Sequence, residues 1–270
     1  MLYGCTVIGG VVGRGVIYKL NTNGLGYTIL HDFVDSNSGY APLGELVGDT
    51  NGFLYGATDS GGAGSVGVIF RLKSDGTSFT VLHDFDYPTA GFGGSGLLLA
   101  SDNSLYGVTS AGGITGGGAV YKINRDGSGF QILYHFVGGS RDGSQPGGTL
   151  TEGSDGRIYG TTAAGGNDGF GIIFSLEKDG TGYCTLHHFV PTTINILSDQ
   201  GVISGSDGNL YGFGANTGPL GFGNLFRLSL AANGRPVVGT PIANQTNSYG
   251  GVLNFTFAAN TFTDPDAGQT

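Results

Sequence analysis

The stretch Leu105-Tyr106-Gly107-Val108-Thr109 decides the fold, because its first three residues recur at regular intervals along the chain. Copies of Leu-Tyr-Gly or Ile-Tyr-Gly occur five times, and their tyrosines are 52, 51, 53 and 52 residues apart. A period near fifty residues means that each copy is one small unit, which buries its apolar surface only by stacking on its neighbours. The copies are anchored at Tyr3, Tyr55, Tyr106, Tyr159 and Tyr211.

Each copy has the pattern of four short β-strands. Around Tyr106, β-rich runs cover residues 96–99, 105–109, 119–123 and 130–136, and turns rich in Gly, Asp and Asn separate them. The dipeptide Asp126-Gly127 between the last two runs is a hairpin signal. Four antiparallel strands repeated about every fifty residues are typical of a β-propeller blade. The sequence therefore predicts an all-β chain, a β-propeller of about five four-stranded blades.

Glycine recurs at the start of the first predicted strand in successive copies, at Gly44, Gly96, Gly148 and Gly201. If this strand lies innermost, as in kelch-type blades, glycine allows the strands to approach one another near the propeller axis. The first copy lacks this first strand and the last copy lacks a recognisable fourth strand, which suggests missing N-terminal sequence. A closed five-bladed ring and an incomplete ring, an arc of a larger one, both fit the pattern.

The composition excludes several classes of function. The chain has 11 basic and 20 acidic residues, a net charge of −9, so nucleic acid and anionic membrane surfaces are not expected partners. It has no apolar run of about eighteen residues, so we expect no membrane insertion. Cys5 and Cys184 lie at different phases of the repeat, and we expect two structural thiols rather than a disulfide.

The combined motif resembles the GloVer tandem repeat. It reads Leu-Tyr-Gly-x-Thr-x-x-Gly-Gly, then Gly-Val-Ile-Phe-x-Leu, then Asp-Gly-Thr, then Leu-His-x-Phe, over residues 54–85. Further copies span 105–136 and 158–189, and partial ones span 2–33 and 210–228. The resemblance implies a bacterial protein that is secreted or displayed on the cell surface, with no export signal visible in this chain. It implies no established activity.

The chain changes character at Pro236. Residues 253–257 and 262–268 resemble the opening of a dystroglycan-type cadherin-like domain, an immunoglobulin-like sandwich of roughly a hundred residues. We therefore divide the chain into propeller repeats, 1–232, and a linker with an incomplete cadherin-like domain, 233–270. Asp264 and Asp266 resemble the acids of cadherin-like calcium sites, and calcium is the one cofactor suggested. A plain Asp-Pro-Asp turn is the competing interpretation.

The histidines lie in the fourth predicted strand of their copies, at His31, His83, His135, His187 and His188. The fourth strand of a kelch-like blade is outermost, so these side chains diverge and cannot share one metal ion. We interpret them, like the five repeat tyrosines, as structural positions. The histidines are expected to hydrogen-bond a neighbouring strand or blade, and Asp32 and Asp84 to orient two of the imidazoles.

Two functions of different classes remain. The sequence favours a non-enzymatic extracellular or cell-surface scaffold that binds glycan or protein through its propeller loops, with no catalytic residues. The alternative is a polysaccharide-active enzyme, a glycoside hydrolase or lyase, that uses loop carboxylates. Its candidates are the non-repeated acids Asp59, Asp142, Glu152 and Asp168. No spacing selects a pair among them, and aspartate in turns usually bonds the backbone.

Overall fold

The structure is a computed structural model that describes residues 1–87, 91–189, 201–214, 224–230 and 237–238. In this part of the chain the regular elements are β-strands, in five antiparallel sheets. The part described contains no helix long and apolar enough to cross a membrane. We number the sheets as blades 1 to 5 in chain order, and the predicted all-β repeat architecture is confirmed.

Blade 1 consists of β1 (Leu2–Thr6), β2 (Val16–Leu20) and β3 (Thr28–Asp32). Blade 2 consists of β4 (Tyr40–Gly48), β5 (Phe53–Ser60), β6 (Val68–Lys73) and β7 (Thr80–Asp84). Blade 3 consists of β8 (Phe92–Gly94), β9 (Leu98–Leu99), β10 (Ser104–Ala111), β11 (Ala119–Asn124) and β12 (Gln131–His135). Blade 4 consists of β13 (Gly143–Glu152), β14 (Ile158–Gly165), β15 (Ile172–Leu176) and β16 (Cys184–His188). Blade 5 consists of β17 (Ile203–Ser204), β18 (Leu210–Gly214), β19 (Asn224–Ser229) and β20 (Val237–Val238).

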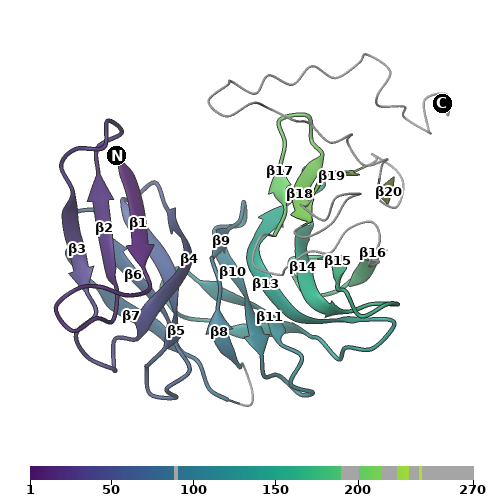
Figure 1. Ribbon diagram of the computed structural model, residues 1–270, viewed down its shortest axis with the longest axis horizontal. Helices are drawn as coiled ribbons and strands as arrows, with labels where there is room; N and C mark the ends of the chain where they lie inside the picture. The colour runs from purple at the N-terminus through teal and green to yellow at the C-terminus, as the bar shows by residue number, and fades with distance from the viewer. Residues whose placement is uncertain (88–90, 190–200, 215–223, 231–236, 239–270) are drawn as a thin grey trace.

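The blades follow one another around an arc (Figure 1). Blade 1 lies at one end of the arc and blade 5 at the other, and both stand apart in this view. In blades 1, 2, 4 and 5 each strand pairs with the next one along the chain, as in the order β4-β5-β6-β7, whereas in blade 3 both β8 and β9 pair with β10. The first strands β4, β9, β13 and β17 contact one another across blades, so the first strand is the innermost one.

Glycine allows these inner strands to converge. A Cβ atom on Gly44 would lie 2.4 Å from the backbone nitrogen of Gly96, and one on Gly96 would lie 2.3 Å from Oγ1 of Thr149. The predicted role of glycine at the axis is thus confirmed. Its predicted place is wrong, because Gly44 and Gly148 lie inside β4 and β13, where the register with the next strand shifts. The first strand therefore begins well before the glycine.

Each blade is apolar on both faces, and we call the face toward the preceding blade its leading face and the other its trailing face. The leading face of blade 2 carries Leu54, Phe70 and Leu72, which pack in one cluster with Phe33 of blade 1. Its trailing face packs against blade 3 in a second cluster, made of Tyr55, Ile69, Phe85, Leu97, Leu105, Tyr121 and Ile123. The core therefore consists of successive layers between blades, and each buried large side chain contributes about 1.5–3 kcal/mol.

Blade 5 differs from the prediction. The strand β20 pairs with β19 through Leu228 and Val238, so this blade has the fourth strand that the sequence did not predict. The residues of β20 lie beyond residue 232, where we predicted the repeats to end. The remainder of the predicted cadherin-like segment, including Asp264 and Asp266, lies outside the described residues, so its domain assignment stays a prediction.

We expect Gly44→Ala to destabilise the protein more than Gly156→Ala. Both glycines have a left-handed backbone, with φ of 74° and 81°, which costs an alanine about 1–2 kcal/mol. A Cβ on Gly156 meets no atom within 4 Å, whereas one on Gly44 meets the backbone of blade 3. Overpacking at the axis should add about 1–3 kcal/mol for Gly44→Ala in urea unfolding. Equal losses would show that the inner strands relax to admit a side chain.

Candidate functional site

Four repeat tyrosines fix the turn that precedes them. Their hydroxyls donate to turn aspartates at 2.6–2.9 Å, in the pairs Tyr55 with Asp49, Tyr106 with Asp102, Tyr159 with Asp155 and Tyr211 with Asp207. The rings of Tyr55, Tyr106 and Tyr159 are buried, whereas Tyr3 is 36% exposed. The tyrosines therefore couple the turn between the first two strands to the core, and the three buried rings offer no surface for ligand stacking.

Near neutral pH the turn aspartates of these pairs stay ionised and the tyrosine hydroxyls stay protonated. Burial opposes the charged form of Asp102, but hydrogen bonds from Lys122 and Tyr106 outweigh it and lower the pKa of this carboxyl to about 2. Burial and the hydrogen bond to Asp49 raise the pKa of Tyr55 to about 12. Groups with such pKa values suit a structural anchor and do not suit proton transfer at neutral pH.

Two of the fourth-strand histidines stack on the next blade. The ring of His31 lies 3.8 Å from that of Phe79 in blade 2, and the ring of His83 lies 3.6 Å from that of Phe130 in blade 3. In blade 3 the stacking residue is Tyr134, whose strand partner is Val120. The structure therefore places His135 one position later in the repeat than His31, His83 and His187.

Hydrogen bonding does not follow the expected pattern at these histidines. The Nε2 atoms of His31, His83 and His187 are buried and have no hydrogen-bond partner in the described part of the chain. Asp32 and Asp84 hydrogen-bond elsewhere, because each accepts a backbone N–H of its own blade's Gly-Gly link, from Val11 and Ala63 respectively. The histidines are therefore packing residues, and the neighbouring aspartates hold the links.

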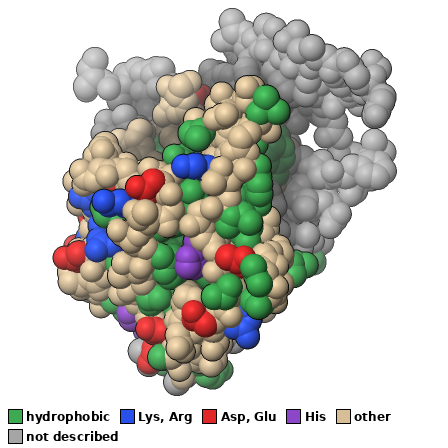
Figure 2. Space-filling model, turned by 90° about the vertical axis from the view of Figure 1, so that its left-hand side faces the viewer, with side chains coloured by type: hydrophobic (Ala, Val, Ile, Leu, Met, Phe, Trp, Pro, Cys, Tyr) green, Lys and Arg blue, Asp and Glu red, His purple; other side chains and the backbone are tan. Residues whose placement is uncertain are grey.

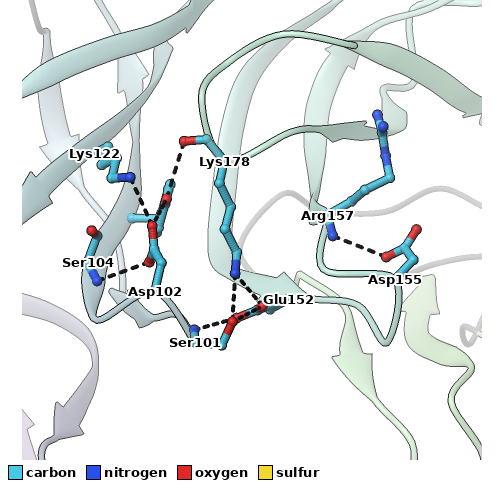
Figure 3. A network of polar contacts seen from close by, with 9 residues as sticks. Ser101, Asp102, Ser104, Lys122, Glu152, Asp155, Arg157 and Lys178 are labelled. Carbon is cyan, nitrogen blue, oxygen red and sulfur yellow. Dashed lines mark hydrogen bonds and ion pairs between the residues drawn. The ribbon is translucent and has the colours of Figure 1, made fainter.

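The candidate acid Glu152 joins blades 3 and 4 (Figure 3). Its carboxylate accepts the backbone N–H of Ser101 at 2.7 Å and binds Nζ of Lys178 at 2.5 Å. Burial raises the pKa of Glu152, but Lys178 and Ser101 outweigh this effect and lower it. Beside it, Asp102 binds Nζ of Lys122 at 2.9 Å. Glu152 is thus held charged in a clamp between blades, which does not suit a catalytic acid.

The other candidate acids lie apart from Glu152. Asp142 is buried and accepts hydrogen bonds from two backbone N–H groups and from the hydroxyl of Tyr183. Asp168 is exposed in the Gly-Gly link of blade 4. Asp59 lines a cavity of about 510 Å³ at the axis, where the inner strands of blades 2 to 5 meet, and Glu45 lines it too. We call this the axial cavity; within the described residues, no hydrogen bond joins any two of the four candidate acids.

A second hollow, of about 360 Å³, lies between blades 2 and 3 at the end of the blades where the aspartate turns lie. We call it the interblade pocket. Its lining is almost entirely polar and includes three amides, two guanidinium groups and two carboxylates. The lining residues are Asp49, Asn51, Phe53, Tyr55 and Arg71 of blade 2 and Asn103, Asn124, Arg125 and Asp126 of blade 3.

Buried contacts fix the charged groups of the interblade pocket. Nη1 of Arg125 lies 3.0 Å from Oδ2 of Asp49, whose side chain is only 2% exposed. Burial raises the pKa of Asp49, but hydrogen bonds from Phe53 and Tyr55, with Arg125 nearby, outweigh this effect and lower it. Arg71 lies over the ring of Phe53, 5.1 Å from its centroid, and donates to the carbonyl of Arg125. Both guanidinium groups are therefore held in place.

The described residues contain no group of three or more His, Cys, Asp and Glu side chains placed to hold a metal ion. Cys5 and Cys184 are free thiols, as expected. The predicted calcium ligands Asp264 and Asp266 lie outside the described residues and stay a prediction.

The profile of the Gloeobacter/Verrucomicrobia repeat matches the chain over residues 1–140 and 89–252. The chain belongs to this repeat family. The predicted GloVer resemblance is thereby confirmed, and the second match runs past the predicted boundary at residue 232. No curated protein matches this GloVer chain.

Solved β-propeller structures share the fold of the GloVer chain at low sequence identity. A gluconolactonase from Xanthomonas campestris is 16% identical, with a TM-score of 0.54 over 86% of this chain and 70% of its own. A luciferin-regenerating enzyme is 15% identical, with a TM-score of 0.54 over 86% of this chain and 78% of its own. At such identities the likeness establishes the β-propeller fold alone, and that prediction is confirmed.

We expect Tyr106→Ala to destabilise the GloVer chain by about 3 kcal/mol or more, because a fully buried aromatic ring is removed from the core. Tyr106→Phe keeps the ring and removes only the hydroxyl, which donates to Asp102 and to the carbonyl of Lys178, so it should cost about 1 kcal/mol. Chemical denaturation measures both changes. A near-zero loss for Tyr106→Ala would mean that the ring is exposed in solution.

Thermal stability should fall as the pH drops from about 7.5 to 5.5. Burial lowers the pKa of His31, His83 and His187, so the unfolded chain binds protons below its usual value of about 6.5 while the folded chain does not. The stability is therefore present above that pH and is lost as the pH falls through it. His83→Tyr copies Tyr134 of blade 3 and should reduce this dependence without abolishing it. An unchanged pH profile in that variant would contradict the assignment.

Proposed function

We propose that this GloVer chain is a non-enzymatic scaffold, exported from the cell or displayed on its surface, that binds neutral glycans in the interblade pocket. The observation that carries the proposal is the lining of that pocket, which combines the amides of Asn51, Asn103 and Asn124 with two fixed guanidinium groups. Amides present a donor and an acceptor together, and guanidinium groups present paired donors. This set matches the adjacent hydroxyl groups of a sugar ring.

The charges of the pocket favour a neutral sugar. Arg71 and Arg125 are balanced by Asp49 and Asp126, so the lining has no net charge to attract a polyanion. The ion pair between the buried carboxylate of Asp49 and the partly exposed Arg125 prepares the site before the ligand arrives, which lowers the entropic cost of binding. Since Arg71 already covers Phe53 and the tyrosine of the pocket is buried, hydrogen bonds rather than ring stacking would supply the affinity.

The axial cavity supports a second candidate, a carbohydrate-active enzyme. Asp59 and Glu45 line this cavity, and two carboxylates facing one space are the minimum that glycoside hydrolysis needs. Two fold neighbours of the chain are enzymes by name, although their low identity supports only the shared fold. In this case the chain would release reducing ends from a polysaccharide, and Asp59→Asn would abolish the release.

The test is thermal melting of the chain across a panel of neutral polysaccharides and their oligosaccharides. A ligand that binds only the native state raises the free energy of unfolding, by about 2.7 kcal/mol at a hundredfold excess over Kd, and so raises the melting temperature. The double variant Asn51→Ala/Asn103→Gly should bind roughly 30-fold more weakly, since two hydrogen bonds of about 1 kcal/mol each are lost. Glycine suits position 103 because φ of Asn103 is 62°.

The matched control is Asn37→Ala, which removes an exposed amide outside the pocket and should leave the shift unchanged. A panel in which no glycan moves the melting temperature would overturn the proposal. A shift that survives the double variant would move the binding site elsewhere. Reducing-end release that Asp59→Asn abolishes would replace the proposal with the enzymatic alternative.

A further inference from the structure

The strands β3, β7, β12 and β16 each end on a residue that faces the Gly-Gly link of its own blade. These residues are Asp32, Asp84, His135 and His188. The two carboxylates each accept a backbone N–H of the link, from Val11 at 2.9 Å in blade 1 and from Ala63 at 2.7 Å in blade 2. Figure 2 shows the molecule from the side on which blade 1 lies in Figure 1. In blades 3 and 4 an imidazole stands where blades 1 and 2 have a carboxylate.

In blade 4 the imidazole has taken over the role of the carboxylate. Nδ1 of His188 accepts the backbone N–H of Asn167 at 3.2 Å, and a Cβ atom on Gly166 would lie 3.2 Å from the same nitrogen. In blade 3, Nδ1 of His135 is buried beside Gly113 and has no hydrogen-bond partner in the described part of the chain. Within the described residues, the link of blade 4 is thus the one that an imidazole holds.

An imidazole accepts a backbone N–H only while it is neutral. The neutral ring has one acceptor nitrogen, whereas both nitrogens are donors in the charged ring. Imidazole is also the side chain whose charge ordinarily changes between about pH 5 and 8. A carboxyl group, in contrast, keeps an acceptor oxygen in either protonation state. The contact in blade 4 therefore depends on pH in a way that the contacts in blades 1 and 2 do not.

Few titratable or charged groups surround His188 on the described elements. The neighbouring strand β15 carries none, and the others are His187 on the same strand, Asp168 on the link, and Arg141 and Asp142 on the preceding loop. The carboxylate of Asp142 is occupied by two backbone N–H groups and by Tyr183. Within the described residues no carboxylate bonds His188, so a proton on its Nδ1 would face the N–H of Asn167 without an acceptor.

We propose that the link of blade 4 is an acid-sensitive switch, which releases its tip, residues 167–169, when His188 takes up a proton. The base of the link stays in place, because the N–H of Gly166 is bonded to the carbonyls of Gly139 and Asp142. The tip is exposed and carries Asp168, so its release changes the surface at this end of the blade. The switch does not rest on the proposed glycan binding, because the interblade pocket lies at the opposite end of the blades.

Amide hydrogen exchange of the full chain between about pH 8 and 5 tests the switch, with protection expressed relative to the unstructured rate at each pH. In wild type the amide of Asn167 should lose its protection toward the lower pH, while those of Ala63 and of β14 stay protected. His188→Asp copies blade 2 and should keep Asn167 protected throughout. Asp84→His copies blade 4 and should make the amide of Ala63 lose its protection at the lower pH.

The matched control is His187→Tyr, which removes the neighbouring imidazole and should leave the exchange of Asn167 as in wild type. Three results would overturn the proposal. The first is protection of Asn167 that does not change with pH in wild type, and the second is a loss of protection that persists in His188→Asp. The third is exchange of the β14 amides together with Asn167, since the whole chain then unfolds. If His188→Asp does not fold, Ala63 that stays protected in Asp84→His overturns the proposal instead.

Discussion

Packing between successive blades is the constraint on which the rest of this structure depends. Each sheet is apolar on both faces, so it buries its apolar surface by packing on its neighbours. The repeat preserves the residues that make this contact, a ring pair on the leading face and a histidine or tyrosine followed by phenylalanine on the trailing face. Aromatic pairs add about 0.5–1.5 kcal/mol each beyond their buried area.

Packing between blades also limits which positions of a blade can differ in sequence from one copy to the next. At the axis, glycine is needed because atoms of a neighbouring inner strand lie close to where a Cβ would be: the backbone of Gly96 for Gly44, and the side chain of Thr149 for Gly96. At the end of the blades where the turns lie, an aspartate and a buried tyrosine hydroxyl fix the backbone of the turn. Once the turn is held, the remaining turn side chains are free to differ between copies. Differences between copies are therefore where a binding function can arise.

Much of the fold follows from the sequence, because the tyrosine period, the Asp-Gly turns and the axial glycines are local signals. The pattern did not predict β20, since Val237–Val238 carries no Leu-His-x-Phe motif. It also misplaced His135, because in blade 3 Tyr134 takes the strand position that His31 and His83 take in blades 1 and 2. The interblade pocket was not predicted at all. Its asparagines look like ordinary turn residues, and two copies contribute them.

The contrast between two equivalent gaps shows how the pocket arises. Arg125 and Lys178 both precede an Asp-Gly turn, but Lys178 bends back to Glu152 of its own blade and closes the clamp. Glu152 pairs in register with Ile158, and the residue paired with Leu105 in blade 3 is Leu99. Without an acid there, Arg125 reaches across to Asp49 of blade 2 instead. Leucine in place of an acid at position 99 thus goes together with the polar space between blades 2 and 3.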